Sequence, residues 1–195
     1  MKRYDYDFSD LYIITTFPSL KIDIEKYPAI KQHLTSFGYD RLNQTGELGA
    51  RKKTNNQWFE TQDTISYWED FYRQKIVWGN LNLKASYCIA PEGYFINAPS
   101  PFITPASNYL LAILNSKLAD YYIRNLGVTR SGGYFEYKPM FVEQLPVPII
   151  QNDTESLFTK LISDGISDKV ESDINTIIYK IYNLTEEEIN FIESQ

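Results

Sequence analysis

The sequence predicts an α+β protein in which a mixed, mostly antiparallel sheet has flanking helices and is followed by a small C-terminal helical segment. Two observations support this prediction. Four short apolar runs between residues 75 and 104 are separated by glycine and proline turns, which is typical of antiparallel strands. Residues 107–124 and the segment after Pro148 instead repeat their apolar side chains at the spacing of a helix.

The N-terminal third should contain an extended segment, one helix and a long loop. Residues 11–16 (LYIITT) are expected to form a strand or a short extended entry. A helix should begin near Pro28, which suits a first helical turn, and end by Gly38. Residues 39–57 are polar and show no apolar period, so we expect a long loop. Such loops in compact domains are usually functional or disordered.

The rest of the chain should supply the sheet and the remaining helices. The expected strands are Lys75–Trp78, Ser86–Ala90, Tyr94–Asn97 and Phe102–Thr104. The expected helices are residues 107–124, which Gly127 stops, and residues 153–164, 170–182 and 185–194. Thr185 and Glu188 form a capping-box pattern at the last of these. We therefore expect a domain over residues 1–150 and an acidic helical segment over residues 151–195 that packs on it.

The net charge of −6 argues against nucleic-acid binding until its distribution along the chain is considered. Residues 151–195 hold three basic and ten acidic side chains, whereas residues 1–150 hold 16 basic and 15 acidic ones. The acidity is therefore confined to the C-terminal segment. A near-neutral body with local basic clusters, such as Arg51-Lys52-Lys53, is compatible with DNA binding.

Several segments, taken in their order along the chain, resemble the TaqI-like specificity domain. The amphipathic stretch Tyr109–Arg124, the link Arg130-Ser131-Gly132-Gly133 and the run Phe135–Pro148 resemble the end of that domain. Further similar segments are Tyr27–Leu34 (YPAIKQHL), Lys75–Trp78 (KIVW) and Tyr179–Ile189 (YKIYNLTEEEI). The chain departs from the family pattern after Trp78, where Gly79-Asn80-Leu81 stands in place of a common acidic residue.

The resemblance implies the DNA target-recognition module of a fused restriction–modification adenine methyltransferase. Such a module selects the DNA sequence and performs none of the chemistry. Its partners would be double-stranded DNA and the methyltransferase or nuclease region of the full-length enzyme. That separate catalytic region would bind S-adenosylmethionine, and magnesium if it also cuts DNA, so no cofactor is expected in this chain.

The sequence carries no well-formed pattern for catalysis, metal binding or membrane insertion. It has neither a glycine-rich S-adenosylmethionine loop nor an Asn/Asp-Pro-Pro-aromatic tetrapeptide. Glu69 and Asp70 before Lys75 imitate a nuclease metal site, but adjacent side chains point in different directions. His33 has no metal partner at helical spacing, and Cys88 in its apolar run should be a buried structural thiol. Without a long apolar run or a signal pattern, we expect a cytoplasmic protein with no membrane contact.

Three groups of polar residues are candidates for DNA binding. Arginine reads guanine bidentately, asparagine reads adenine, and lysine binds phosphates. The loop of residues 39–57 supplies Arg41, Arg51, Lys52, Lys53, Asn55 and Asn56. The predicted first strand and the residues after it supply Lys75, Asn80 and Lys84, whereas Trp78 there should be a core residue. The third group is Arg130, Ser131, Gly132 and Gly133, where the glycines permit close backbone approach to phosphate.

Two other classes of function stay open. The first is a protein-interaction or assembly module that docks through its acidic helices, and the second is a stand-alone enzyme. An exposed apolar face on residues 107–124 or 170–192 would favour assembly. A basic face formed by the loop, Lys75 and Arg130 would favour DNA.

Overall fold

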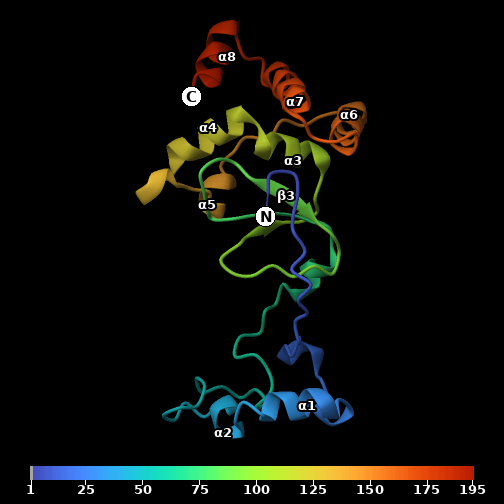
Figure 1. Ribbon diagram of the computed structural model, residues 1–195, viewed down its shortest axis with the longest axis vertical. Helices are drawn as coiled ribbons and strands as arrows, with labels where there is room; N and C mark the ends of the chain where they lie inside the picture. Colours follow the sequence, from blue (N-terminus) through green and yellow to red (C-terminus); the bar gives the residue numbers. More distant parts are fainter. Residues whose placement is uncertain (1) are drawn as a thin grey trace. The chain divides into compact units, whose positions relative to one another are not determined.

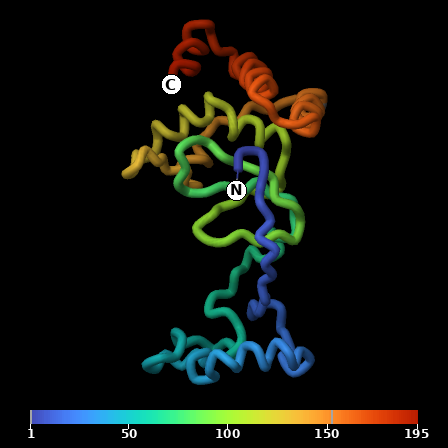
Figure 2. Tube along the Cα trace, viewed as in Figure 1, coloured from blue at the N-terminus to red at the C-terminus, as the bar shows by residue number. Residues whose placement is uncertain are grey.

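The computed structural model describes residues 2–195 and divides into two compact units. Unit 1 comprises the residues up to Ser9 together with Asp70–Gln195, and unit 2 comprises Asp10–Glu69. The chain therefore enters unit 2 after its first few residues and returns to unit 1 near residue 70, as the colours of Figure 2 trace. The acidic segment lies in the same unit as residues 70–150, and the division expected at residue 150 stays a prediction.

Unit 1 is built on a three-stranded antiparallel sheet with the strand order β3–β1–β4. The central strand β1 (Lys75–Trp78) pairs with β3 (Tyr87–Ala90) on one side and with β4 (Phe102–Ile103) on the other. A separate antiparallel ribbon joins β2 (Leu81–Asn82) to β5 (Phe135–Glu136). All four residues of β1 are buried, because Ile76 and Trp78 pack in the main core and Val77 packs in a second cluster with Cys88 and Ala90.

Two layers of helices cover this sheet (Figure 1). The layer nearer the sheet consists of α3 (Asn108–Asn115) and α4 (Lys117–Leu126), with the short α5 (Pro139–Val142) beside α4. The outer layer consists of α6 (Asn152–Ser163), α7 (Asp168–Ile181) and α8 (Glu186–Glu193). Phe158, Ile174 and Ile178 of the outer layer are fully buried in the main core, so the acidic segment is an integral part of unit 1.

The single helix expected over residues 107–124 is two helices in the structure. Ser116 has extended backbone angles, φ −69° and ψ 156°, and its hydroxyl accepts a hydrogen bond from the backbone of Ala119. A serine that caps a new helix in this way ends the preceding one. The second helix stops at Gly127 as predicted, and the capping box of Thr185 and Glu188 is confirmed.

Unit 2 is smaller and contains mostly irregular chain. Its helical elements are η1 (Pro18–Leu20), η2 (Ile24–Lys26), α1 (Pro28–Thr35), α2 (Tyr39–Leu42) and the start of η3 (Trp68–Tyr72). Helix α1 begins at Pro28, as the sequence predicts. Residues 11–16 form no strand with any described residue, so the alternative of a short extended entry is the correct one. Phe17, Ile24 and Phe59 are the buried apolar residues of this unit.

The predicted α+β class is confirmed, with corrections to individual strands. Residues 94–97 do not form the expected strand. Instead, Tyr94 packs edge-on against Tyr6 at a centroid distance of 5.6 Å, and Phe95 stacks on Phe71 at 4.5 Å. Aromatic packing therefore holds this segment in place of a strand ladder. Within residues 2–195, no helix is long and apolar enough to cross a membrane.

Candidate nucleic-acid interface

The polar loop of residues 43–57, which follows α2, is ordered by hydrogen bonds within its own backbone. The Arg51 amide donates to the carbonyl of Asn43 at 3.0 Å, and the Gly46 amide donates to the carbonyl of Arg51 at 2.9 Å. Gly46 has φ +78°, and a Cβ there would lie 3.0 Å from the Cβ of Lys53. Glycine is therefore required at this close approach, and the loop presents a defined surface.

Gln44 ties the two ends of the polar loop together. Its side chain is 4% exposed, and its Nε2 donates to the carbonyls of Gln57 at 3.0 Å and Glu60 at 2.8 Å. Its Oε1 accepts a hydrogen bond from the Thr54 hydroxyl at 2.5 Å. Both amide hydrogens and the amide oxygen thus have partners, which is what a buried amide requires.

Arg51, which the sequence predicts as a DNA contact, binds the backbone of unit 2. Its Nε donates to the carbonyl of Leu42 at 2.7 Å, and its Nη2 donates to the carbonyl of Trp58. Partial burial lowers the pKa of Arg51 from its ordinary value. Asn56 behaves similarly, because its Nδ2 donates to the carbonyl of Thr61 at 2.9 Å. Both side chains shape the loop.

Four other candidates of this group are exposed, namely Arg41, Lys52, Lys53 and Asn55. The three cations make no ion pair with any carboxylate of the part of the chain that the structure describes. Exposed cations without a counter-charge can neutralise DNA phosphates and so release the counterions that are condensed on the DNA. Arg41, Lys52 and Lys53 are therefore available to a polyanion.

Of the three candidates around β1 and β2, Lys75 belongs to the interior of unit 1, which corrects the expectation for that residue, whereas Asn80 is partly buried. Lys75 is fully buried, its Nζ donates to the carbonyl of Pro91 at 2.9 Å, and burial lowers its pKa. Asn80 donates from Nδ2 to the carbonyl of Pro99 at 2.8 Å, and its Oδ1 is buried without a hydrogen-bond partner among residues 2–195. The buried ammonium of Lys75 offers no donor to DNA, whereas the Nδ2 group of Asn80 lies at the surface. Lys84 is exposed, and Trp78 is a core residue, 2% exposed.

The third group forms a tight turn between α4 and β5, here called the glycine turn (residues 130–133). The amide of Arg130 donates to the carbonyl of Tyr134 at 2.7 Å, which closes the turn. Gly132 and Gly133 both have φ +79°, a conformation that favours glycine. A Cβ at Gly133 would meet no atom within 4 Å, so the backbone there is open to an incoming group.

A buried carboxylate anchors the glycine turn. Glu136 on β5 is 3% exposed, and its Oε1 accepts hydrogen bonds from Nε of Arg130 at 2.6 Å and from Nη2 of the same guanidinium. The ammonium of Lys138 lies 3.1 Å from the same oxygen. The hydrogen bond from Arg130, reinforced by Lys138, lowers the pKa of the Glu136 carboxyl. The Arg130 side chain nevertheless remains 53% exposed.

Sequence reasoning missed Lys138 and a second cation nearby, Arg124. The Arg124 guanidinium lies 3.8 Å from the centroid of the Phe135 ring and is paired with Asp120 at 3.1 Å. Glu136 and Lys138 are two positions apart in an extended run, so their side chains lie on one face. This spacing in the sequence could have indicated Lys138 as a candidate.

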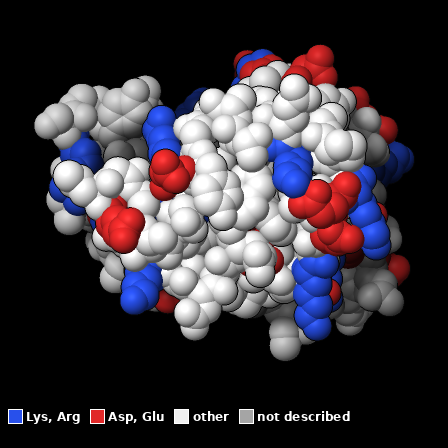
Figure 3. All heavy atoms as spheres, turned by 90° about the horizontal axis from the view of Figure 1, so that it is seen from below, with Lys and Arg blue, Asp and Glu red and all other residues white. Residues whose placement is uncertain are grey.

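One face of the molecule and the metal-binding residue types give no further candidate site among the described residues. On the face drawn in Figure 3, lysine and arginine side chains alternate with acidic ones, and no continuous basic patch covers it. Across residues 2–195, no three His, Cys, Asp or Glu side chains gather into a possible metal site.

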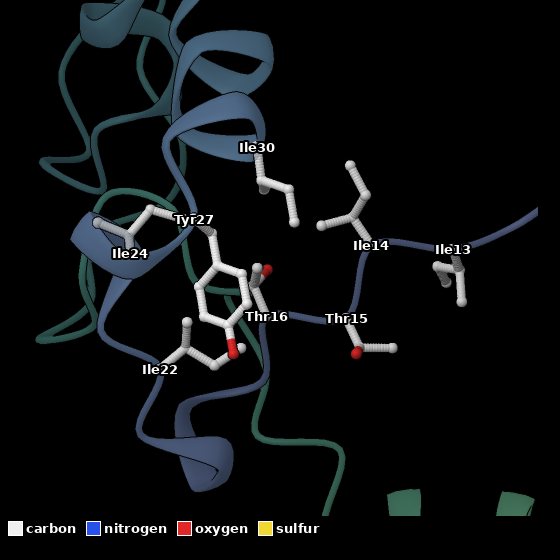
Figure 4. A pocket seen from close by; sticks show the side chains of 8 residues that line it. All are labelled: Ile13, Ile14, Thr15, Thr16, Ile22, Ile24, Tyr27 and Ile30. Carbon is white, nitrogen blue, oxygen red and sulfur yellow. The ribbon is translucent and has the colours of Figure 1, made fainter.

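Unit 2 also contains an apolar hollow of about 300 Å³. It is lined by Ile13, Ile14, Thr15, Thr16, Ile22, Ile24, Tyr27 and Ile30. Figure 4 shows Ile14 and Ile30 facing each other across it, with the Tyr27 ring close to Ile22 and Thr16. Because none of these side chains ionises near neutral pH, the hollow offers apolar contact and no acid–base chemistry.

The model of one protein family, the TaqI-like C-terminal specificity domain, matches residues 18–147 of the chain. The match covers two thirds of the sequence, so the chain belongs to this family, as the resemblance predicted. It includes the polar loop and the glycine turn, whereas the acidic helices lie beyond it. The protein is therefore a DNA-recognition module of the kind found in restriction–modification enzymes. No curated protein matches the chain.

Proposed function

We propose that this chain recognises a specific sequence of duplex DNA on behalf of an adenine methyltransferase of a restriction–modification system. The single observation that supports this most is the family match, which spans the ordered polar loop and the glycine turn. S-adenosylmethionine, and magnesium where the enzyme also cuts DNA, are assigned to a separate catalytic region. The partners of the chain are then duplex DNA and that region.

The exposed groups divide into two roles in this proposal. Cations bind backbone phosphates, which sets the position of the protein on the duplex, and amides bind base edges. The phosphate contacts are Arg41, Lys52, Lys53, Lys84 and Arg130. Asn55 is the exposed amide available for a base edge, and Ser131, Gly132 and Gly133 let backbone approach the DNA closely. Arg51 and Asn56 support the polar loop from within.

The alternative of an assembly module has less support. An exposed apolar face on residues 107–124 or 170–192 would have favoured it. Leu111, Leu114 and Ile123 of the first stretch are instead buried, as are Ile174 and Ile178 of the second. These side chains are used inside unit 1, so they are not available to a partner.

The test of DNA recognition compares two triple variants with equal charge change in the full-length enzyme. Replacing Arg41, Lys52 and Lys53 by alanine should weaken DNA binding. It should also reduce the slope of log K against log salt by up to about 0.9 for each phosphate that is no longer neutralised. The control replaces the exposed Lys160, Lys169 and Lys180 of the acidic segment by alanine and should leave the slope nearly unchanged. Equal effects of the two variants would mean that only net charge matters and would refute the assignment of the polar loop.

A second test concerns chemistry. In the proposal the chain has no catalytic residues, so the purified chain should neither transfer a methyl group from labelled S-adenosylmethionine to DNA nor cut DNA with magnesium present. Turnover in either assay, persisting after further purification, would contradict the proposal.

A further inference from the structure

The contacts around Glu136 form a charge arrangement that the proposed function does not explain. Two exposed cations, Arg130 and Lys138, bind the same oxygen of this carboxylate, which is 3% exposed. Glu136 lies on β5, whereas Arg130 is the first residue of the glycine turn and Lys138 follows the strand. One buried carboxylate therefore fixes two cations from different segments at one point of the surface.

The two cations would not stay together without this carboxylate. Like charges that both lie within hydrogen-bonding distance of one atom repel each other, and side-chain entropy also favours their separation. The Glu136 carboxylate, on the inner side of the two cations, attracts both of them and so offsets their mutual repulsion. The side chains of Arg130 and Lys138 remain 53% and 41% exposed, so the other side of the pair faces solvent. The cluster of two cations and one carboxylate has a net charge of +1.

This arrangement suits a phosphodiester. A guanidinium has five donors, of which Nε and Nη2 contact Glu136, and an ammonium has three. Donors that remain can bind phosphate oxygens while the inner ones stay on the carboxylate. A phosphate on the solvent side would meet two cations whose positions are already fixed, which reduces the entropy lost on binding.

We propose that Glu136 is a positioning residue for DNA recognition, which holds Arg130 and Lys138 together as a binding site for one backbone phosphate of the duplex. This inference rests on the proposed function. Phosphate contacts set the register of a protein on DNA, so a fixed pair contributes to selection of the target. Lys138 becomes a DNA contact in addition to the residues assigned above.

The experiment separates this positioning role from charge alone. Glu136→Gln removes the anchor and one negative charge, and the control Glu143→Gln removes one negative charge from an exposed position of the same unit. The full-length enzyme is measured with its target, selected from a randomised duplex library, and with mixed-sequence duplex. Both variants should bind mixed-sequence DNA slightly more tightly. Only Glu136→Gln should lose preference for the target, by about tenfold, because the released cations bind phosphates in several registers.

Each outcome decides the proposal. Equal target preference in Glu136→Gln and Glu143→Gln would overturn it. If Glu136→Gln does not fold, Lys138→Gln decides, since it keeps the Arg130–Glu136 contact and should lower the preference severalfold; an unchanged preference would overturn the proposal. If the wild-type enzyme selects no target from the library, the proposed function fails, and this outcome is distinct from a failure of Glu136 alone.

Discussion

The polar loop of unit 2 and the glycine turn of unit 1 use an arginine in opposite ways. Arg51 directs its guanidinium to backbone carbonyls of Leu42 and Trp58, so its donors hold the loop together. Arg130 directs its guanidinium to the Glu136 carboxylate and stays 53% exposed. In sequence the two are alike, since each lies near two glycines in a polar segment. The acceptors that surround each arginine determine its role.

The difference has an energetic consequence. Removing Arg51 leaves partly buried carbonyls without donors, and the cost of an unsatisfied buried group exceeds the gain from making the bond. Removing Arg130 exposes a carboxylate that keeps Lys138 as a partner. We therefore expect removal of Arg51 to destabilise the polar loop, and removal of Arg130 to weaken the contact of the glycine turn with DNA.

The largest expected effect comes from Arg51→Ala. The variant lacks two hydrogen bonds from a charged donor, so the free energy of unfolding should fall by about 2–3 kcal/mol. The neighbouring Lys52→Ala, at an exposed position, should change it by less than about 0.5 kcal/mol. Urea unfolding measures both, and amide exchange should locate the Arg51→Ala defect in residues 43–58. Equal stability of the two variants would mean that Arg51 does not stabilise the polar loop.

The second prediction concerns Lys75, which the sequence placed with the DNA contacts. Lys75→Met should raise the free energy of unfolding by about 1 kcal/mol, because a buried ammonium with only a carbonyl partner is replaced by an apolar chain of similar length. Burial lowers the pKa of Lys75 below 10.5, so at high pH the unfolded chain binds more protons than the folded one. The free energy of unfolding of the wild type should therefore contain a contribution that increases as the pH rises towards 10.5. Lys75→Met should lack this contribution. A loss of DNA affinity in a stable Lys75→Met protein would indicate that Lys75 contacts DNA.

Much of the fold follows from short-range patterns, whereas the site depends on contacts across the chain. The sequence predicts helices α1, α6, α7 and α8 because apolar periodicity and capping residues act within a few positions. The ribbon of β2 and β5 was missed, since two-residue strands are too short to show a period. Its pairing joins residues that are more than fifty positions apart.

The candidate site shows the same limit. Lys75 shares a strand face with Val77 by period two, so its burial beside an apolar neighbour was accessible from the sequence. The inward orientation of Arg51 was not, because its acceptors are backbone carbonyls and carry no residue-type signal. The sequence carries no signal that Glu136 is buried and paired with two cations, and only the fold reveals it.

A smaller effect, in acid, distinguishes the turn from the loop. The pKa of Glu136 is lowered by Arg130, so the folded state holds this proton less tightly than the unfolded state, whose carboxyl has the ordinary value of 4.5. The stabilisation is fully present above pH 4.5 and is lost as pH falls through the lowered pKa. NMR amide shifts of residues 129–138 should change in that range and should not change there in Glu136→Gln. Arg51 contacts no carboxylate, so Arg51→Ala should keep this transition of residues 129–138, and its loss in that variant would contradict the assignment.

The smallest expected effect concerns the acidic helices. Deleting residues 151–195 would remove Phe158, Ile174 and Ile178 from the core, so the charge must be changed with the fold intact. Replacing the exposed Asp164, Asp173 and Glu187 by Asn, Asn and Gln removes three negative charges. Affinity for mixed-sequence DNA should rise by less than about threefold at physiological salt, where the Debye length is about 8 Å, and by more at low salt. Arg130→Ala should lower affinity by the same factor with or without these changes, if the helices act only through their general field. A sharp loss of binding in the folded triple variant would instead mean that the acidic helices contact a partner directly.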